Sequence, residues 1–219
     1  MSANVIVSYD GSDNDDDGLA LARLLAAAGA TLALAYVRHS HEFDEGREHL
    51  AQYDAERRLE LGATWLGDPD IARHVIVTPS TSEGLRTLAE SEGAALIVFG
   101  SDYRTPLGHA EPGAAAQNLL EGGSRAVAVA AAGLRADPDA KIASIGVLTP
   151  EGDTAAQQTA EALAGKLGAQ LADSTSADLI VVGSQASGNR ITLSGAIRSK
   201  LDSSRGSTLV VPSGQPVLL

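Results

Sequence analysis

The chain has 219 residues, a formal net charge of −12 and no cysteine. An acidic surface repels nucleic acids and anionic lipid, and the lack of cysteine excludes disulfides, thiolate metal sites and cysteine catalysis. Aromatic residues make up only 3% of the chain, so Ala, Val, Leu and Ile must build the core and base-stacking platforms are not expected. We find no signal-peptide pattern and no apolar run near the ~18 residues of a membrane span, and therefore expect a cytoplasmic protein with no membrane or nucleic-acid partner.

Up to residue 130 the sequence alternates continuous apolar runs with amphipathic stretches. The expected strands are residues 4–9, 31–37, 72–78, 94–99 and 125–130, and the expected helices are residues 12–28, 44–65, 82–91 and 113–121. Apolar strands that are continuous rather than alternating are typical of a parallel sheet covered on both faces. With right-handed crossovers this order predicts an α/β fold with a doubly wound, parallel, five-stranded sheet.

Residues 133–141, which include Asp137-Pro138-Asp139, are interpreted as a linker to a shorter second unit. In that unit we expect strands at residues 142–148, 179–182 and 208–211, and helices at residues 153–167 and 194–201. If residues 169–172 pair with the sheet at all, we expect an edge fragment or an antiparallel strand, because a crossover past a parallel neighbour needs about a dozen residues. A counterpart of residues 44–91 is missing. The domain prediction is therefore a complete unit at 1–132 and a truncated copy at 142–219.

A short repeat supports two related units. The apolar run that ends at Gly100-Ser101 reappears at Gly183-Ser184, an offset of 183 − 100 = 83 residues. Each copy is followed by a Gly-containing loop, a helical stretch and a Val-rich run, which indicates a duplicated strand–loop–helix–strand element.

The opening strand with its Asp10-Gly11-Ser12 turn, together with the strand–loop–helix–strand of residues 94–130, resembles the universal stress protein family. The chain is similar to a tandem member of this family with a shortened, degenerate second repeat. The resemblance implies the adenine-nucleotide alpha-hydrolase-like fold. It also implies a non-catalytic stress-response protein that binds an adenine nucleotide weakly in its first unit, with ATP or AMP as candidates and Mg²⁺ only as a companion of the nucleotide.

Nucleotide-binding members of the family carry Gly-x2-Gly-x9-Gly followed by Ser or Thr. Gly100 and Gly113 match the first and third glycines, whereas Tyr103 and Ala114 replace the second glycine and the hydroxyl residue. Glycines let backbone amides approach a phosphate, and the last glycine opens a helix whose N-terminus attracts anions. The resemblance assigns the ribose to the acid after the first strand and the adenine to the end of the second strand. The residues so implied as a nucleotide site are Asp10, Gly11, Ser12, Val37, Gly100, Ser101, Gly113 and Ala114.

Each of these features also has a structural interpretation. Asp10 can cap the following turn, and Gly100 and Gly113 can serve packing or turns. The acidic residues 13–17 are interpreted as a solvated helix start favoured by the helix dipole, and residues 39–44 as a polar loop rather than a metal site. His109 with Glu111 is a weaker alternative for acid–base chemistry. We assign no catalytic residue and no metal ligand.

Two further functions stay open at this point. One is a nucleotide-hydrolysing or nucleotidyl-transferring α/β enzyme, although the P-loop motif is missing. The other is a ligand-free scaffold that acts through a protein partner, which the sequence does not identify. In every case we expect residues 125–130 and 208–211 to associate, because unpaired apolar edge strands are a liability. This association would make an internal pseudo-dimer, and a homodimer is compatible with it.

Overall fold

The computed structural model describes residues 3–122, 125–173, 176–187 and 190–219. The first half contains β1 (Val5–Ser8), α1 (Asp13–Ala26), β2 (Leu32–Arg38), α2 (Glu45–Leu66), β3 (Ala72–Val77), α3 (Thr81–Glu92), β4 (Leu96–Phe99), α4 (Ala114–Gly122) and β5 (Ala126–Val129). After the 3-10 helix η1 (Leu134–Ala136), the second half contains β6 (Ser144–Leu148), α5 (Ala155–Leu167), β7 (Gln170–Ala172), β8 (Leu179–Gly183), β9 (Gln185–Ser187), β10 (Arg190–Thr192), α6 (Gly195–Ser203) and β11 (Ser207–Val211).

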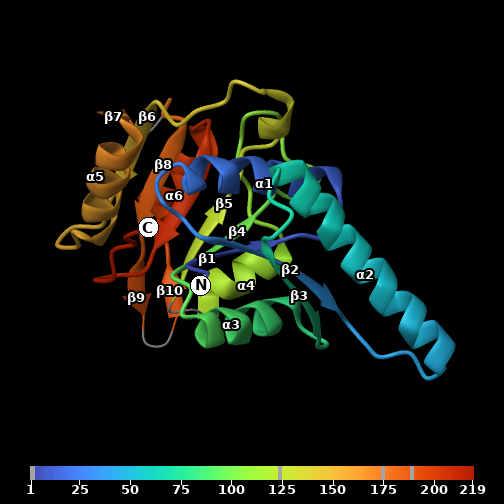
Figure 1. Cartoon of the computed structure of the whole chain (residues 1–219). Coiled ribbons are helices and arrows are strands. Elements are labelled where there is room, and N and C mark those ends of the chain that lie inside the picture. The colour runs from blue at the N-terminus through green and yellow to red at the C-terminus, as the bar shows by residue number, and fades with distance from the viewer. Residues whose placement is uncertain (1–2, 123–124, 174–175, 188–189) are drawn as a thin grey trace.

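Within the described residues, these elements build one nine-stranded sheet in the order β3-β2-β1-β4-β5-β11-β8-β6-β7 (Figure 1). Neighbouring strands pair in parallel except β5 with β11. One face packs against α1, α2 and α5, and the other against α3, α4 and α6. The predicted doubly wound α/β fold, with a five-stranded parallel array in the first half, is confirmed.

The two half-sheets meet at β5 and β11, which pair in antiparallel register. Thr208 lies opposite Val129, and Val210 lies opposite Val127. The loops beside the strands join as well, because Ala131 N donates to Ser207 Oγ over 3.0 Å. The expected association of these two segments is therefore confirmed, and one hydrophobic core runs across both halves on the α1 side.

The second half repeats the strand order of the first with the third strand missing. In the first half β2, β1, β4 and β5 are neighbours in that order, and in the second half β7, β6, β8 and β11 are. β7 is an edge strand parallel to β6, which confirms the edge-fragment alternative for residues 169–172. It pairs only with Ser144–Gly146 at the start of β6. The chain therefore has to pass only the beginning of β6 to reach β8, which a short connection can do.

β9 and β10 form a separate two-stranded antiparallel sheet that was not predicted, because two three-residue strands are too short to give a periodic apolar signal. Residues 133–141, interpreted as a linker, contain η1, and the amides of Gly133 and Arg135 donate to Asp17 of α1. Among the described residues, no helix has the length and apolar character needed to cross a membrane.

Gly206, just before β11, has a backbone conformation and surroundings that would strain any residue with a side chain. Its φ is +113°, and an added Cβ would overlap the carbonyl oxygen of Ala177 and lie 3.0 Å from that of Asp178. Its amide also donates to the carbonyl oxygen of Gly108 over 2.8 Å. Gly206 therefore fixes how β11 enters the sheet beside the first-half loop.

We predict that Gly206→Ala lowers the free energy of unfolding by about 2–4 kcal/mol, because left-handed strain and steric overlap add. Gly214→Ala is the matched control, since Gly214 also has positive φ but has no atom within 4 Å of an added Cβ. It should cost only about 1–2 kcal/mol. Urea denaturation measures both, and equal losses would contradict the role given to Gly206.

Candidate functional site

The turn after β1 is held by its own side chains. Asp10 Oδ1 accepts a hydrogen bond from Ser12 N at 2.8 Å, and Gly11 between them has φ +85°. The Ser12 side chain makes no cap bond to α1. The Asp10 carboxylate therefore caps the turn, as the structural interpretation of this residue expected. Asp10 and Ser12 are both exposed.

A second carboxyl group sits directly beneath this turn. Asp15 Oδ2 accepts from Asp10 N at 2.6 Å. Burial, together with the nearby charge of Asp10, raises the pKa of Asp15 to about 8. Burial also raises the pKa values of Asp16 and Tyr9, and the Tyr9 hydroxyl donates to Asp16 Oδ1 at 3.2 Å. Asp15 is therefore largely protonated at neutral pH, and the amide of Asp10 already has an acceptor.

Asp17 corrects the interpretation of residues 13–17 as a solvated helix start. Its side chain is buried and accepts from the amides of Gly133 and Arg135, each at 2.8 Å. The Arg135 guanidinium completes the contact with a 3.0 Å ion pair to Asp17 and reaches Asp13 at 3.3 Å. This part of the cluster ties the segment after β5 to α1. The sequence pattern gave no sign of it, because the partners lie more than a hundred residues away.

Sequence reasoning also missed Arg58. From α2, its Nη1 donates to the carbonyl oxygen of Asp10 at 2.7 Å, and its guanidinium lies 5.7 Å from the centre of the Tyr36 ring. This places one cation beside the acidic turn. No local motif marks Arg58, since it comes from a helix face 48 residues further along the chain.

The end of β2, where Val37 lies, is fixed by a polar network. β1 pairs with β2 only as far as Ala35, so Val37 extends past the last β1 pair, and its side chain is buried on the α3 side. The next residue, Arg38, is buried and forms a bidentate pair with Glu48 at 2.7 and 3.1 Å. These contacts hold the pKa of Glu48 at about 2, chiefly through the Arg38 hydrogen bond.

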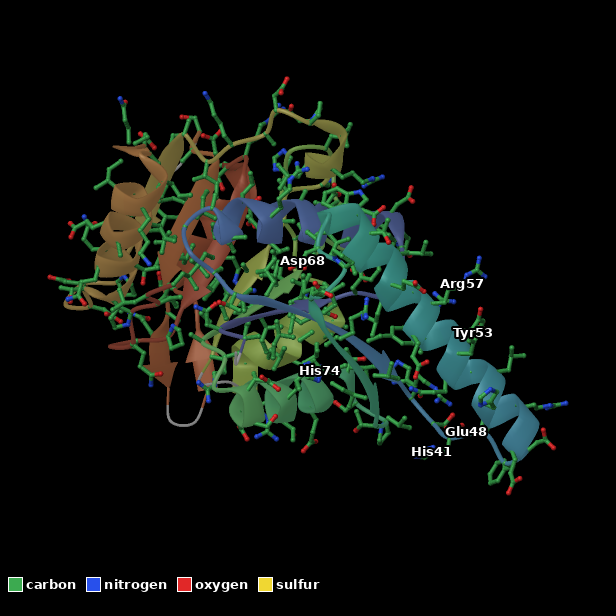
Figure 2. All side chains as sticks on the ribbon, viewed as in Figure 1. His41, Glu48, Tyr53, Arg57, Asp68 and His74 are labelled. Carbon is green, nitrogen blue, oxygen red and sulfur yellow. The ribbon has the colours of Figure 1, made fainter. Side chains whose placement is uncertain are left out.

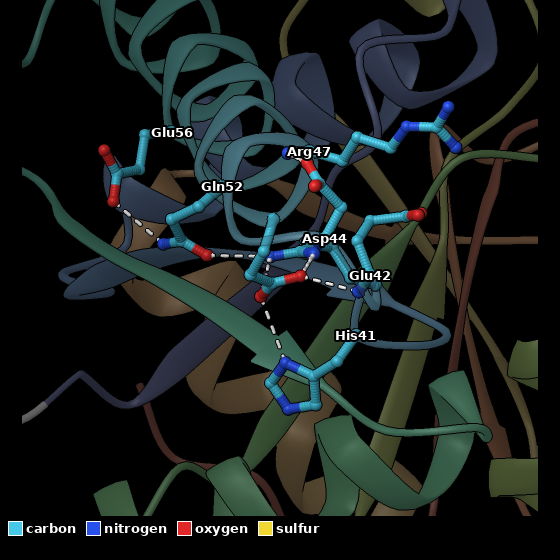
Figure 3. A network of polar contacts seen from close by, with 8 residues as sticks. His41, Glu42, Asp44, Arg47, Gln52 and Glu56 are labelled. Atoms are coloured by element: carbon cyan, nitrogen blue, oxygen red, sulfur yellow. Dashed lines mark hydrogen bonds and ion pairs between the residues drawn. The ribbon is translucent and has the colours of Figure 1, made fainter.

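The same network organises the polar loop before α2 (Figure 3). Glu48 also accepts from Glu42 N at 2.8 Å and lies 3.0 Å from His41 Nδ1, while Asp44 caps α2 at Arg47 N. His41 and Glu48 lie near the N-terminal end of α2, the end that is farther from α1 (Figure 2). In the part of the chain that the structure describes, no group of three or more His, Cys, Asp or Glu residues is arranged to hold a metal ion.

Gly100 and Ser101 at the end of β4 are engaged in packing. A Cβ on Gly100 would overlap the carbonyl oxygen of Asn14, so α1 lies directly against this strand end. The Ser101 hydroxyl donates to Ala130 O at 2.6 Å and accepts from Glu111 N at 3.2 Å. Both residues therefore connect elements of the fold.

The second Gly-Ser pair does the same work. A Cβ on Gly183 would lie 2.7 Å from Pro150 Cδ, just before α5. The Ser184 hydroxyl donates to Val211 O at 2.9 Å, as Ser101 does to the segment after β5. The repeated motif thus marks a repeated packing arrangement. In the loop after Gly183, Ala186 stands where the family motif has its second glycine, and Gly188 is close to it in sequence. The side chain of Ala186 and the whole of Gly188 lie outside the described part of the chain.

Gly113 and Ala114 stand apart from Gly100. They open α4, and a Cβ on Gly113 would meet no atom within 4 Å. The loop before them closes on itself through a bridge between Ser101 and Pro112. Tyr103 points outward, with 69% of its surface exposed and the Arg104 guanidinium 4.8 Å from its ring centre.

The predicted residues therefore fall into two places. Asp10, Gly11, Ser12, Val37, Gly100 and Ser101 gather at the carboxyl ends of β1, β2 and β4, which are neighbours in the sheet. Gly113 and Ala114 line a cavity of about 750 Å³ between α4 and α6. None of the other six predicted residues lines that cavity.

Comparison with known proteins places the fold. Residues 1–130 match the family model described as the Universal stress protein family. A universal stress protein from Archaeoglobus fulgidus is similar in structure, with a TM-score of 0.71 and 14% sequence identity over 98% of this chain and 100% of that one. A functionally unknown protein from Pseudomonas aeruginosa has a TM-score of 0.61 and 14% identity over 97% and 93% of the two chains. No curated protein matches the sequence.

The packing role of Gly100 predicts a sharp contrast with Gly113. Gly100→Ala should lower the free energy of unfolding by about 2–4 kcal/mol, because the backbone of α1 must move. Gly113→Ala should cost less than about 1 kcal/mol, the typical difference between glycine and alanine before a helix. Chemical denaturation of both variants checks this. Similar stabilities would contradict the close approach of α1 to β4.

The raised pKa of Asp15 predicts a pH-dependent stability. Because the folded-state value of about 8 lies above the ordinary 3.8, this group's contribution is fully present below about pH 4 and is lost as the pH rises to about 8. Asp15→Asn keeps an acceptor for Asp10 N without titrating. Between pH 4 and 8 it should gain about 1–3 kcal/mol relative to the wild type, a range discounted for partial exposure.

Thermal denaturation across this pH range measures the effect. Asp15→Ala is the control, since it removes both the titration and the acceptor and should be less stable than Asp15→Asn at every pH. Parallel pH profiles for Asp15→Asn and the wild type would contradict the raised pKa.

Proposed function

The chain belongs to the universal stress protein family, and on that premise we propose that it is a non-catalytic stress-response protein whose first half binds an adenine nucleotide weakly. In this proposal the ribose meets Asp10, the adenine meets the backbone at Val37, and the phosphates approach the start of α4 at Gly113 and Ala114. The proposal is supported by the adjacency of the β1, β2 and β4 ends and by the extension of Val37 past the last β1 pair. The N-terminus of a helix such as α4 attracts anions.

We expect weak binding because several groups of the predicted site already contact other residues of the chain. Asp15 occupies the amide of Asp10, the backbone of Asn14 covers Gly100, and the Ser101 hydroxyl is bonded to Ala130. A nucleotide bound at the ends of β1, β2 and β4 would have to displace these contacts, and the acidic turn would repel its phosphates. The same engagement supports a non-catalytic role, because the Ser101 hydroxyl has no base beside it among its bonded partners.

The wider organisation is part of the proposal. We take residues 1–132 and 142–219 as the two units, joined by 133–141, with the β5–β11 pair making them an internal pseudo-dimer. A soluble, cytoplasmic location fits the composition. This arrangement is compatible with a homodimer of such chains. It is also compatible with a protein partner that recognises the nucleotide-bound chain.

The electrostatics predict an unusual order of ligands. Isothermal titration calorimetry at pH 7 without Mg²⁺ should give dissociation constants on the order of 1 mM for AMP and weaker for ATP, since each added phosphate faces the acidic turn. Mg²⁺ should narrow the gap between the two nucleotides. Cyclic AMP, with one negative charge, should bind at least as well as AMP.

The variant Tyr103→Gly with Ala114→Ser should tighten AMP binding roughly 2- to 10-fold, the value of one hydroxyl hydrogen bond. Ala114→Ser alone separates the contribution of the hydroxyl from that of the glycine. Micromolar ATP binding by the wild type would contradict the proposed weakness. No heat from any adenine nucleotide at millimolar concentration, in wild type and variant alike, would favour a ligand-free scaffold.

A further inference from the structure

A cavity lies at the junction of the two halves, where α6 stands opposite α4 over the β5–β11 pair. Its volume is about 750 Å³, which is within the range of small-molecule sites. Apolar side chains form its floor and walls: Val129 from β5, Val210 from β11, Leu120 from α4, and Leu193 and Leu201 at α6.

The polar part of the lining is strongly acidic. Among the described residues it contains the four carboxylates Asp102, Glu111, Glu121 and Asp202 and one guanidinium, Arg198, which leaves a formal charge of −3 when His109 is counted as neutral. Asp102 accepts from the amide of Arg104. The side chains of the other four charged residues have no hydrogen-bond or ion-pair partner among the described residues.

This combination selects a ligand by charge. Carboxylates without partners, at the edge of an apolar recess in a protein of net charge −12, attract a cation and repel an anion. An ammonium group can remain among them in water while an attached apolar body enters the recess, as long amphipathic side chains do. We propose that the cavity between α4 and α6 binds an amphipathic organic cation, namely a primary amine that carries an alkyl or aryl body.

The proposal does not depend on nucleotide binding in the first half. The cavity includes Gly113 and Ala114, where the proposed nucleotide phosphates approach α4, but neither Asp10 nor Val37. Its carboxylates oppose phosphate binding there, in keeping with the weak nucleotide binding proposed above, and favour a cation. The ligand carries no phosphate. Because the walls of the cavity come from both halves, an occupant would contact α4 and α6 together. It would stabilise the folded chain by an amount that rises with the logarithm of its concentration relative to Kd.

Three ligands with the same chain and different charge test the proposal: octylamine, octanol and octanoate. Each is titrated into the full chain at pH 7 by calorimetry, below its aggregation concentration, with the melting temperature as a second readout. Octylamine should bind about 3- to 10-fold more tightly than octanol, and octanoate should bind most weakly. The advantage of the amine over the alcohol should shrink at high salt, because the carboxylates are exposed.

Glu121→Gln combined with Asp202→Asn should reduce octylamine affinity to near that of octanol and leave octanol unchanged. Asp54→Asn combined with Glu60→Gln removes the same charge from the exposed surface of α2 and should preserve most of the preference. Leu201→Trp should fill the recess and abolish binding of all three ligands. Leu61→Trp, on an exposed α2 position, is its control. Each variant is first compared with the wild type by circular dichroism.

Four outcomes would overturn the proposal. Equal affinity for the three ligands would show an apolar recess without charge selection. A preference for octanoate would show that Arg198 and the α4 N-terminus outweigh the carboxylates. No binding of octylamine, or binding that survives in both the acid and Leu201 variants, would place the amine elsewhere or nowhere.

Discussion

The structure depends on the antiparallel pairing of β5 with β11. Without this pair, each half-sheet would end in an edge strand with unpaired backbone groups. All residues of these two strands, Ala-Val-Ala-Val in β5 and Ser-Thr-Leu-Val-Val in β11, are buried in the structure. Pairing satisfies both edges at once and lets one core extend across the α1 side of the nine-stranded sheet. It also brings α6 opposite α4, which creates the cavity at the junction. The second half has no counterpart of α2, β3 and α3, so it has fewer elements with which to build a core. Its attachment to the complete first half compensates for this.

The repeated Gly-Ser pair shows how a motif can have a packing role that requires no ligand. At both strand ends the glycine lets the start of a helix, or the segment just before it, approach closely. The serine hydroxyl donates to a carbonyl oxygen at the end of the neighbouring strand, Ala130 O just after β5 or Val211 O at the end of β11. These two contacts fix the distances between a strand, the helix packed on it and the adjacent strand. The glycine of a phosphate-binding loop and the glycine of a close-packed strand end are indistinguishable in sequence. They differ only in what occupies the space beside them, and here Asn14 occupies it.

The acidic start of α1 combines local and long-range roles. Asp10 and Asp15 close the turn after β1, whereas Asp17 reaches the segment after β5 and pairs with Arg135. Adjacent carboxyl groups that meet in this way either lose charge or find a cation, since two unpaired charges in a partly buried site are costly. Asp15 follows the first route and Asp17 the second. The turn on which the family resemblance rests is therefore already satisfied by neighbouring residues.

Sequence alone determined the fold class, the order of the long elements and the β5–β11 association. Continuous apolar runs, helix caps and unpaired edges are local or additive signals, so the strands and helices were located to within a few residues. The sequence also indicated a family through Asp10, Gly100 and Gly113, because the spacing of motif residues can be recognised from the sequence alone. Only the tertiary structure decided which of those groups are free. Arg58 and Asn14 reach the ends of β1 and β4 from other elements, and Arg135 reaches α1. β9 and β10 are too short to show a pattern, and the walls of the acidic cavity come from both halves. Such contacts depend on how distant segments pack, which no local spacing encodes.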